Sequence, residues 1–306
     1  MTEIEAQAGE SDGGLLKAGR WLWLRTLAWM VVLVVVLGVL ANIEPLGRLA
    51  LHRPVRRSGP IGEVVGVALA YAAYAGAVWR FERRRPEELA PQTLPRDLLY
   101  GLSIGAAMFA VVFLVLEGIG AYSLNPGGQP HWIVSIMRTL CTGLSEELLF
   151  RAVVFRLLMR AFGPWWALLV SAALFGAAHF LSPHASLTAG AAIAIEAGLM
   201  LAAFYLITGR IWLSVGAHAA WNFTQGTIFG AAVSGQGAVG TLYLAILNRR
   251  LPDGLTGGDF GPEASLPAIL VGLAVFLVAL LVWLRKKRGP AVIVRRQVDL
   301  QPDPAA

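Results

Sequence analysis

The sequence has little charge and almost no cysteine. Only 14% of its 306 residues are charged, whereas 57% are hydrophobic, and the mean hydropathy is +0.64. This composition excludes an ordinary soluble domain and is typical of a membrane protein. The single cysteine, Cys141, excludes a disulfide framework and a cysteine-based zinc site.

Several signatures of soluble chemistry are also missing. The sequence contains no Rossmann, kinase or P-loop pattern and no His-Glu-x-x-His zinc motif. The net charge of +6 comes from arginines between apolar runs. Such arginines indicate membrane topology rather than a nucleic-acid surface, so we expect no nucleic-acid partner. The start of the chain is acidic and lacks the pattern of a signal peptide, so we expect residues 1–19 to be a disordered tail.

Long apolar runs dominate what remains. A spanning helix needs about 20 mostly apolar residues, and the candidates are 21–42, 60–79, 98–117, 132–160, 164–182, 185–208, 211–230 and 267–284. The predicted fold class is therefore all-α, a polytopic membrane helix bundle of about eight transmembrane helices. Residues 231–266 are rich in glycine and proline and are predicted to form a long external loop.

The basic residues predict an orientation. Most of the positively charged loops fall on one side of the membrane if both termini are cytoplasmic. The 43–59 loop disagrees, because its four arginines would then lie outside. An interfacial amphipathic helix, a missed segment or a re-entrant segment in this loop would each remove the conflict.

Two adjacent glutamates interrupt the fourth apolar run. Ionisable groups at membrane depth are costly and usually face a protein interior or a watery cavity. Glu147 and Arg151 are spaced i,i+4, so they share a helix face and can pair. Glu146 lies about 100° around the helix and can point elsewhere. One carboxylate can then be a structural anion and the other a base, although a purely structural charge cluster is also consistent with the sequence.

Later apolar runs carry an imidazole and an amide at comparable depth. At 1.5 Å per residue, Glu146 and His179 lie roughly 21 and 22 Å from the inner ends of their helices. His218 and Asn222 share one face of a third helix, at roughly 12 and 18 Å. Helix tilt and uncertain helix ends can absorb the difference, and we then expect all four side chains to meet in one layer. Glu146, His179 and His218 could bind zinc with an open position, or they could polarise a water without a metal. No cofactor is firmly predicted.

These residues form three motifs in order. The pattern Glu146-Glu147-x-x-x-Arg151, then Phe175-x-x-x-His179, then His218-x-x-x-Asn222, resembles that of the CPBP intramembrane proteases. The family includes the type II CAAX prenyl endopeptidases, typified by the Ras-converting enzyme, and the bacteriocin-immunity (Abi) proteins. The motifs cover about 142–226.

The resemblance implies a role for each matching residue. Glu146 would activate the attacking water with help from His179, and His218 and Asn222 would stabilise the oxyanion. Glu147 would support the site. Two further residues would provide structural support, Arg151 and Phe175. Many family members are described as metalloproteases, while the structural view of the family favours a glutamate mechanism without metal.

The resemblance also implies a fold, a setting and partners. It predicts a bundle that encloses an intramembrane cavity. The expected domains are a tail (1–19), N-terminal helices (20–130), the catalytic core (131–230), the external loop (231–266), and a last helix with a basic cytoplasmic tail (267–306). The expected protein is a multi-pass endopeptidase of a bacterial cell membrane. It would act on membrane-embedded or lipid-modified substrates in or beside the lipid bilayer.

Two other functions remain open from the sequence. Buried glutamate and histidine also form relays in ion-coupled transporters. A non-catalytic accessory or immunity protein could retain the same residues. Glu196 either pairs with a neighbouring helix or lines the cavity, and Arg138 either binds a substrate carboxylate or extends towards the interface. The Gly101-x-Ser103-x-Gly105 pattern is interpreted as helix packing rather than as a nucleophile elbow.

Overall fold

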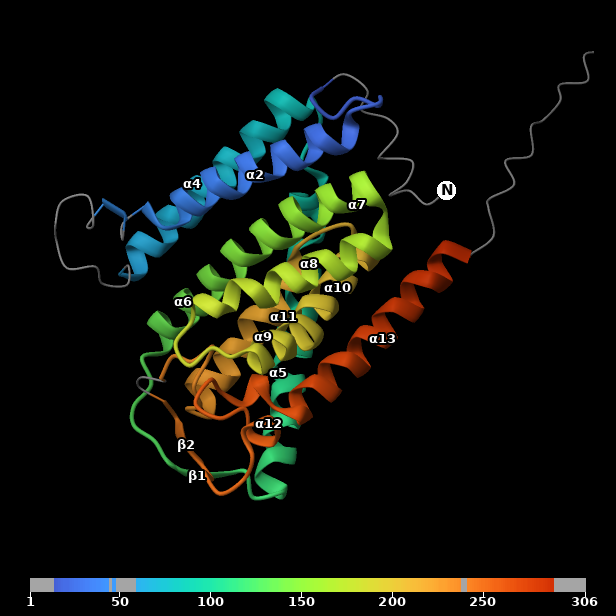
Figure 1. Cartoon of the computed structure of the whole chain (residues 1–306). Coiled ribbons are helices and arrows are strands. Elements are labelled where there is room, and N and C mark those ends of the chain that lie inside the picture. The colour runs from blue at the N-terminus through green and yellow to red at the C-terminus, as the bar shows by residue number, and fades with distance from the viewer. Residues whose placement is uncertain (1–13, 44–45, 48–58, 238–240, 289–306) are drawn as a thin grey trace, which may run out of the picture.

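The computed structural model describes residues 14–43, 46–47, 59–237 and 241–288 (Figure 1). Most of the basic 43–59 loop, the first part of the expected tail and the segment after 288 lie outside these residues. The predictions made for them are therefore not addressed by the structure.

The described helices form long rods, several of which contain a π-helical or 3-10 segment. The first rods in chain order are α2 (Leu22–Ala41), α4 (Pro60–Ala77) with η1 (Val78–Glu82), and α5 (Leu94–Gly118), which follows η2 (Glu87–Leu89) and η3 (Pro91–Thr93). The next rods are α6 (Trp132–Glu147) with η4 (Leu148–Phe155) and α7 (Arg156–Phe162), and α8 (Pro164–Ala178) with η5 (His179–Leu181). The last are α9 (Leu187–Ile193) with η6 (Ala194–Leu199) and α10 (Met200–Thr208), α11 (Trp212–Phe223) with η7 (Thr224–Ile228), and α13 (Leu266–Arg288). The predicted all-α bundle is confirmed.

Six of the described rods are long and apolar enough to cross a membrane. They are Leu22–Ala41, Pro60–Glu82, Glu87–Gly118, Pro164–Leu181, Leu187–Thr208 and Leu266–Lys287. The α6–η4–α7 rod differs because it carries several charged residues, and the α11–η7 rod differs because it is short. The chain is thus a helical membrane protein, and the count of eight spanning helices stays a prediction.

Proline and glycine mark several helix boundaries. Pro60 and Pro164 are the first residues of α4 and α8, where the missing N–H costs nothing. Gly163, with φ of 81°, separates α7 from α8, and Gly209, with φ of 67°, ends α10. Both glycines adopt a conformation that is strained for a residue with a side chain, so glycine at these positions determines where the helices end.

Helices α5 and α11 pack backbone to backbone. A Cβ added at Gly101 would lie 2.3 Å from the carbonyl oxygen of Leu213, and one at Gly105 would lie 2.1 Å from that of Ala217. Ser103 points away from this contact and donates a hydrogen bond to the carbonyl of Leu99, at 2.9 Å. The packing interpretation of the Gly-x-Ser-x-Gly pattern is therefore confirmed.

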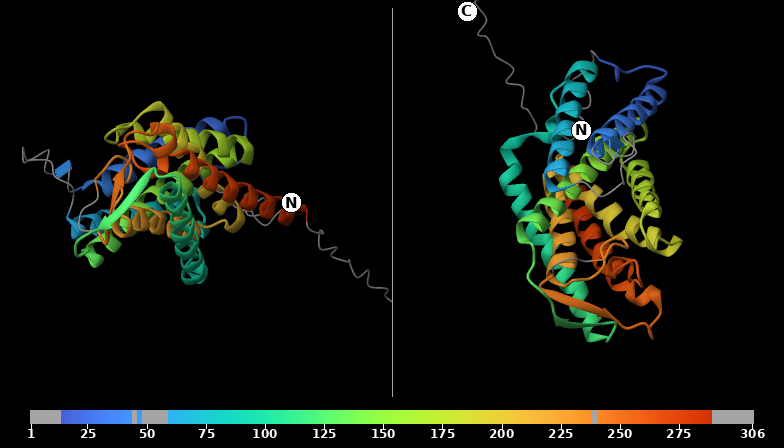
Figure 2. Two further views of the ribbon diagram at one scale, coloured as in Figure 1. Left: turned by 90° about the horizontal axis from the view of Figure 1, so that it is seen from below. Right: turned by 90° about the vertical axis from the view of Figure 1, so that its left-hand side faces the viewer.

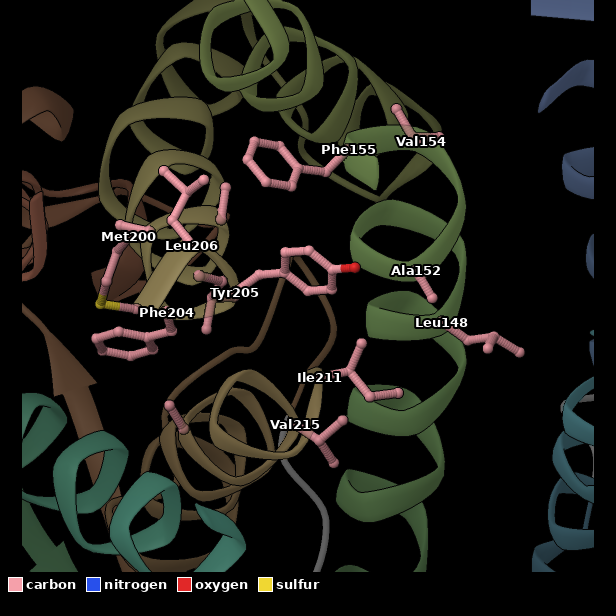
Figure 3. Packing of buried hydrophobic residues seen from close by; sticks show 14 of the residues in the cluster. Leu148, Ala152, Val154, Phe155, Met200, Phe204, Tyr205, Leu206, Ile211 and Val215 are labelled. Atoms are coloured by element: carbon pink, nitrogen blue, oxygen red, sulfur yellow. The ribbon is translucent and has the colours of Figure 1, made fainter. Parts of the chain in front are cut away.

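The main hydrophobic core lies where the α6–η4–α7 rod meets α10 and α11. In Figure 3, Tyr205 of α10 extends towards the helix that carries Ala152 and Phe155, and Ile211 lies nearby. The rings of Phe155 and Tyr205 meet edge to face at 5.6 Å. A smaller cluster around Phe175 packs beneath Phe260. These two cores position the helices that carry the predicted site.

The 231–266 segment, predicted as a long loop, contains regular structure. Strand β2 (Tyr243–Leu247) pairs antiparallel with β1 (Tyr122–Pro126), and Tyr122 is opposite Leu247. The short helices α12 (Asp253–Thr256) and η8 (Pro262–Ala264) follow. In Figures 1 and 2 this segment folds back against one end of the bundle, next to α9 and α13. It therefore brings its own side chains to the helices.

Residues 14–19, predicted to belong to a disordered tail, are instead placed against the bundle. The amide of Leu15 donates a hydrogen bond to the carbonyl of Phe81, at 2.8 Å. Leu16 is buried in the main core. Burial of the Leu16 side chain explains this packing, because it removes hydrocarbon surface from solvent.

Candidate functional site

The glutamate pair lies where α6 changes into the π-helical segment η4. Glu147 is fully buried, and its Oε1 accepts a hydrogen bond from Arg151 at 3.0 Å. This confirms that the i,i+4 spacing places the two charges on one face. The Glu146 side chain is 31% exposed, so it diverges from its neighbour as its place on the helix predicts.

Arg151 is itself buried and has further partners. It donates to the carbonyl oxygen of Ala197, at 3.2 Å, on the neighbouring segment η6. Its guanidinium lies 4.4 Å from the centre of the Phe175 ring, which is a cation–π contact. The arginine thus joins the glutamate helix, α8 and η6.

His218 comes from α11 and reaches the same carboxylate. Its Nδ1 donates to Oε1 of Glu147 at 2.9 Å. This bond fixes the ring orientation and places the proton on Nδ1, because a carboxylate can only accept. The other nitrogen, Nε2, lies 3.9 Å from Oε2 of Glu146. Two adjacent carboxylates therefore face the two nitrogens of one imidazole ring.

His179 is the first residue of the 3-10 turn that follows α8. Its Nδ1 donates to the carbonyl oxygen of Phe175 at 2.8 Å. In the neutral ring this leaves Nε2 as an acceptor. The imidazole is therefore prepared to accept a hydrogen bond from a water.

A small cavity of about 30 Å³ lies beside the two imidazoles. A water needs about 10–15 Å³ of such space and two to four polar partners, so the cavity can hold water. Its polar lining residues are His179, Glu196, His218, Asn222, Ser234 and Glu263. A cavity between the helices, as predicted, is therefore present in the described structure.

The structure brings the predicted residues together in two groups. Glu146 and Glu147 meet at His218, while His179 and Asn222 line the cavity with it. Within the described residues, no ion pair joins Glu146 to His179 directly, so His218 is the nearer imidazole to the predicted base. A water or a substrate group would have to bridge Glu146 and His179.

Two cavity residues were not predicted as part of the site, and one was left undecided. Ser234 and Glu263 come from the 231–266 segment, which was interpreted as a loop. Glu196 proves to line the cavity rather than to pair with another helix. A sequence signal existed for Glu263, since it follows Pro262 just before the last apolar run and has no basic neighbour.

The remaining candidates lie elsewhere or do not fit. Arg138, left open as a substrate ligand, approaches Glu63 at 3.8 Å. Among the described residues, no three His, Cys, Asp or Glu side chains are arranged to hold a metal ion. The arrangement of donors therefore does not fit the zinc site that the sequence allowed, and no chemical step below uses a metal.

The comparisons with known proteins agree with the motifs. Residues 128–224 match the model of the Rce1-like type II CAAX prenyl endopeptidase family. This segment is Rce1-like. The match covers less than half of the chain but includes all three motifs, so the resemblance to the CPBP family is confirmed. Searches of curated proteins and of solved structures gave no match.

The Rce1-like segment and the six apolar helices indicate the same class of protein. They support an integral membrane protein of the CAAX-protease-like intramembrane peptidase class. Such a family implies a membrane-associated protein substrate and a lipid environment. Glu263 and Ser234 lie outside the matched segment, so the match says nothing of their roles.

Proposed function

We propose that the protein is an intramembrane endopeptidase that hydrolyses a peptide bond of a lipid-modified or membrane-embedded substrate. The observation that carries this proposal is the arrangement around His218. One buried carboxylate fixes its Nδ1, a second lies 3.9 Å from its Nε2, and a water-sized cavity lies beside it. Family likeness adds the CAAX-type substrate class.

Glu146 is the general base. It takes a proton from a water, whose oxygen attacks the carbonyl carbon of the substrate. His179 accepts the second hydrogen bond of the same water through its free Nε2. The proton on Glu146 then passes to the substrate nitrogen as the C–N bond breaks, which leaves a carboxylic acid and an amine. The remaining proton of the water passes from the acid to the amine, so the products are a carboxylate and an ammonium group.

His218 and Asn222 stabilise the oxyanion that forms during attack. Since Nδ1–H of His218 is donated to Glu147, a proton on Nε2 makes the ring a donor on its cavity side as well. The amide of Asn222 lies one helical turn further along α11 and lines the same cavity. Donors of this kind each contribute about 10²–10³-fold to acyl transfer.

The direct test is cleavage of a fluorogenic prenylated CAAX peptide, and of its unprenylated counterpart, by the purified full-length protein in lipid. Glu146→Gln should lower the rate by about 10²–10⁴-fold, the usual contribution of a general base. His179→Ala should have a comparable effect. Ser103→Ala is the matched control, because Ser103 is polar and helical but bonds only to its own helix.

The proposal fails if Glu146→Gln cleaves as fast as the wild type. If neither peptide is cleaved by any variant, the same pair is compared by profiling new protein termini in membranes from expressing cells. Identical terminus profiles for the wild type and Glu146→Gln would then reject a peptidase and favour an accessory role.

A further inference from the structure

Two buried carboxyl groups share the cavity with the proposed catalytic residues but have no part in the mechanism above. Glu196 projects from the π-helical segment η6, and Glu263 projects from η8 after β2. Each is only 2% exposed, and both line the cavity. Because η8 belongs to the segment that folds back on the bundle, this segment completes the cavity wall.

Glu263 is held by a built arrangement. Its Oε1 accepts two hydrogen bonds from Ser234, one from the backbone N–H at 2.7 Å and one from Oγ at 2.9 Å. Ser234 has a positive φ of 47°, which is uncommon for a residue with a side chain. Such backbone conformations persist where the surroundings require them, and here they direct both donors at one oxygen.

Glu196 is held differently and keeps an unused acceptor. Its Oε2 is buried and has no hydrogen-bond partner within the described residues. Helix α13 closes on its backbone through Gly272, where an added Cβ would lie 2.6 Å from the Cα of Glu196. The side chain cannot retreat on this side, so its carboxylate remains in the cavity wall.

The charges around the cavity do not balance. Glu196 and Glu263 line it, and Glu146 and Glu147 meet at His218 beside it. Opposite these four carboxyl groups are the guanidinium of Arg151 and the imidazoles of His179 and His218. Arg151 gives its hydrogen bonds to Glu147 and to the carbonyls of Ala197 and Gly198. An uncompensated buried carboxylate is costly and must be neutralised by a proton or by a cation.

The size and lining of the cavity select the cation. At about 30 Å³ it has room for a small group such as an –NH₃⁺ head. An ammonium group has three donors and no acceptor, which suits the unpartnered Oε2 of Glu196 and the neighbouring carboxylate of Glu263. The rings of Phe175 and Trp221 also line the cavity, and aromatic surfaces favour cations.

We propose that Glu196 and Glu263 form a binding site for a primary ammonium group of the peptidase substrate. This rests on the proposed function. Two sources share this chemistry: the side chain of a lysine near the scissile bond, and the amino terminus that hydrolysis creates. In both cases the site recognises the positively charged nitrogen through carboxylate–ammonium hydrogen bonds.

The first experiment measures binding of methylammonium to the purified full-length protein by calorimetry and by thermal unfolding. The wild type should bind it saturably. Glu196→Gln and Glu263→Gln should each weaken binding by about 10–100-fold, the scale of one hydrogen bond to a charged group. Glu117→Gln, which removes an exposed carboxylate far from the cavity lining, is the matched control and should bind like the wild type.

Glu146→Gln separates this proposal from the proposed function. It should keep methylammonium binding while cleavage is lost. If the wild type binds methylammonium but cleaves no peptide, the ammonium site is supported and the peptidase proposal is wrong. If it cleaves peptides but does not bind methylammonium, the peptidase proposal is supported and the ammonium site is wrong. If a divalent ion stabilises the wild type and methylammonium does not, the site is a metal site and the proposal is wrong.

A competition experiment distinguishes the two sources. Nα-acetyl-lysine methylamide carries only the side-chain ammonium, and alanine methylamide carries only the terminal ammonium. Displacement of methylammonium by the first assigns the site to a substrate lysine, and displacement by the second assigns it to the released amine. If neither compound displaces it, no peptide ammonium reaches the cavity, and the proposal is overturned.

Discussion

Two buried ionic clusters in this bundle differ in how completely their charges are paired. The closed network consists of Glu82, Arg84, Glu88 and Arg156, with Tyr74 and Trp29. The open cluster consists of Glu146, Glu147, Arg151, Glu196, His218 and Glu263. Both place carboxylates where burial is costly, and yet only one leaves acceptors unused.

The closed network is balanced. Glu82 accepts two hydrogen bonds from Arg156, both at 2.8 Å, and others from Arg84 and Trp29. Arg84 also binds Glu88 through two hydrogen bonds of 2.8 Å. Tyr74 donates to Glu88 as well. Two carboxylates thus face two guanidiniums in bidentate geometry, which is the strongest form of this pairing.

The open cluster is not balanced. Among the described residues, atoms of Glu146, Glu147, Arg151 and Glu196 are buried without a hydrogen-bond partner, while no side-chain atom of the closed network is. The open cluster also adjoins a cavity. The comparison suggests that the closed network stabilises the fold and that the open cluster retains unpaired groups for a ligand.

The largest effect on stability is expected in the closed network. Glu82→Ala removes both 2.8 Å hydrogen bonds of Arg156 and leaves it only the more distant Glu88, 3.5 Å from its Nε, so the free energy of unfolding should fall by about 3–5 kcal/mol. Thermal unfolding in detergent measures this loss. Glu117→Ala, at an exposed site, is the control. An unchanged unfolding temperature for Glu82→Ala would contradict the structural role of the network.

Glu147→Gln should separate stability from activity. Glutamine can still accept one hydrogen bond, so we expect a loss of about 1–3 kcal/mol, smaller than for Glu82→Ala. Cleavage should fall much more steeply, because the neutral amide no longer fixes the proton on Nδ1 of His218. Unfolding and cleavage are measured on the same preparation. A parallel loss of both would make Glu147 a merely structural residue.

A smaller effect concerns pH. Burial raises the pKa of Glu263 above its ordinary value. A carboxyl whose pKa is raised in the folded state contributes stability that is fully present below its unfolded pKa, about 4.3, and is lost as pH rises through the folded value. Stability should therefore decline with pH across this window. The decline should be flatter in Glu263→Gln, as unfolding at several pH values will show, and equal slopes would contradict this origin.

The smallest effect is expected outside both clusters. Arg249 and Asp259 form an ion pair at 2.6 Å, but both side chains are exposed. Exposed pairs contribute little, because water and salt screen them. Arg249→Ala should leave the unfolding temperature unchanged within error. A clear loss there would mean that pairing alone, rather than burial, determines the cost in this protein.

Much of the open cluster could be predicted from local spacing. The i,i+4 rule placed Glu147 against Arg151. The counted depth of His218 fell short of that of Glu146, so its place in the same layer required a tilted helix or a different helix end. These are properties of single helices. Glu263 could not be placed in this way, because it reaches the cavity only after the chain has formed β2 and folded back.

The closed network was missed for a different reason. Arg84 belongs to a basic run that indicated membrane topology, although its side chain is 20% exposed and pairs with two carboxylates. Composition cannot distinguish an arginine that faces the cytoplasm from one that folds back on its own helix. The direction of the Arg84 side chain depends on Arg83, which adopts a positive φ of 55° and turns the chain there.

The glycine contact between α5 and α11 has one more consequence. Because the two backbones touch at Gly101 and Gly105, α11 has no room to shift towards α5. The helix that carries His218 and Asn222 is therefore held in place on this side. His179 instead begins a short 3-10 turn that leads into the α8–α9 connection. We therefore expect a peptide to be admitted by movement of the turn that carries His179, while the backbone of His218 and Asn222 stays in place.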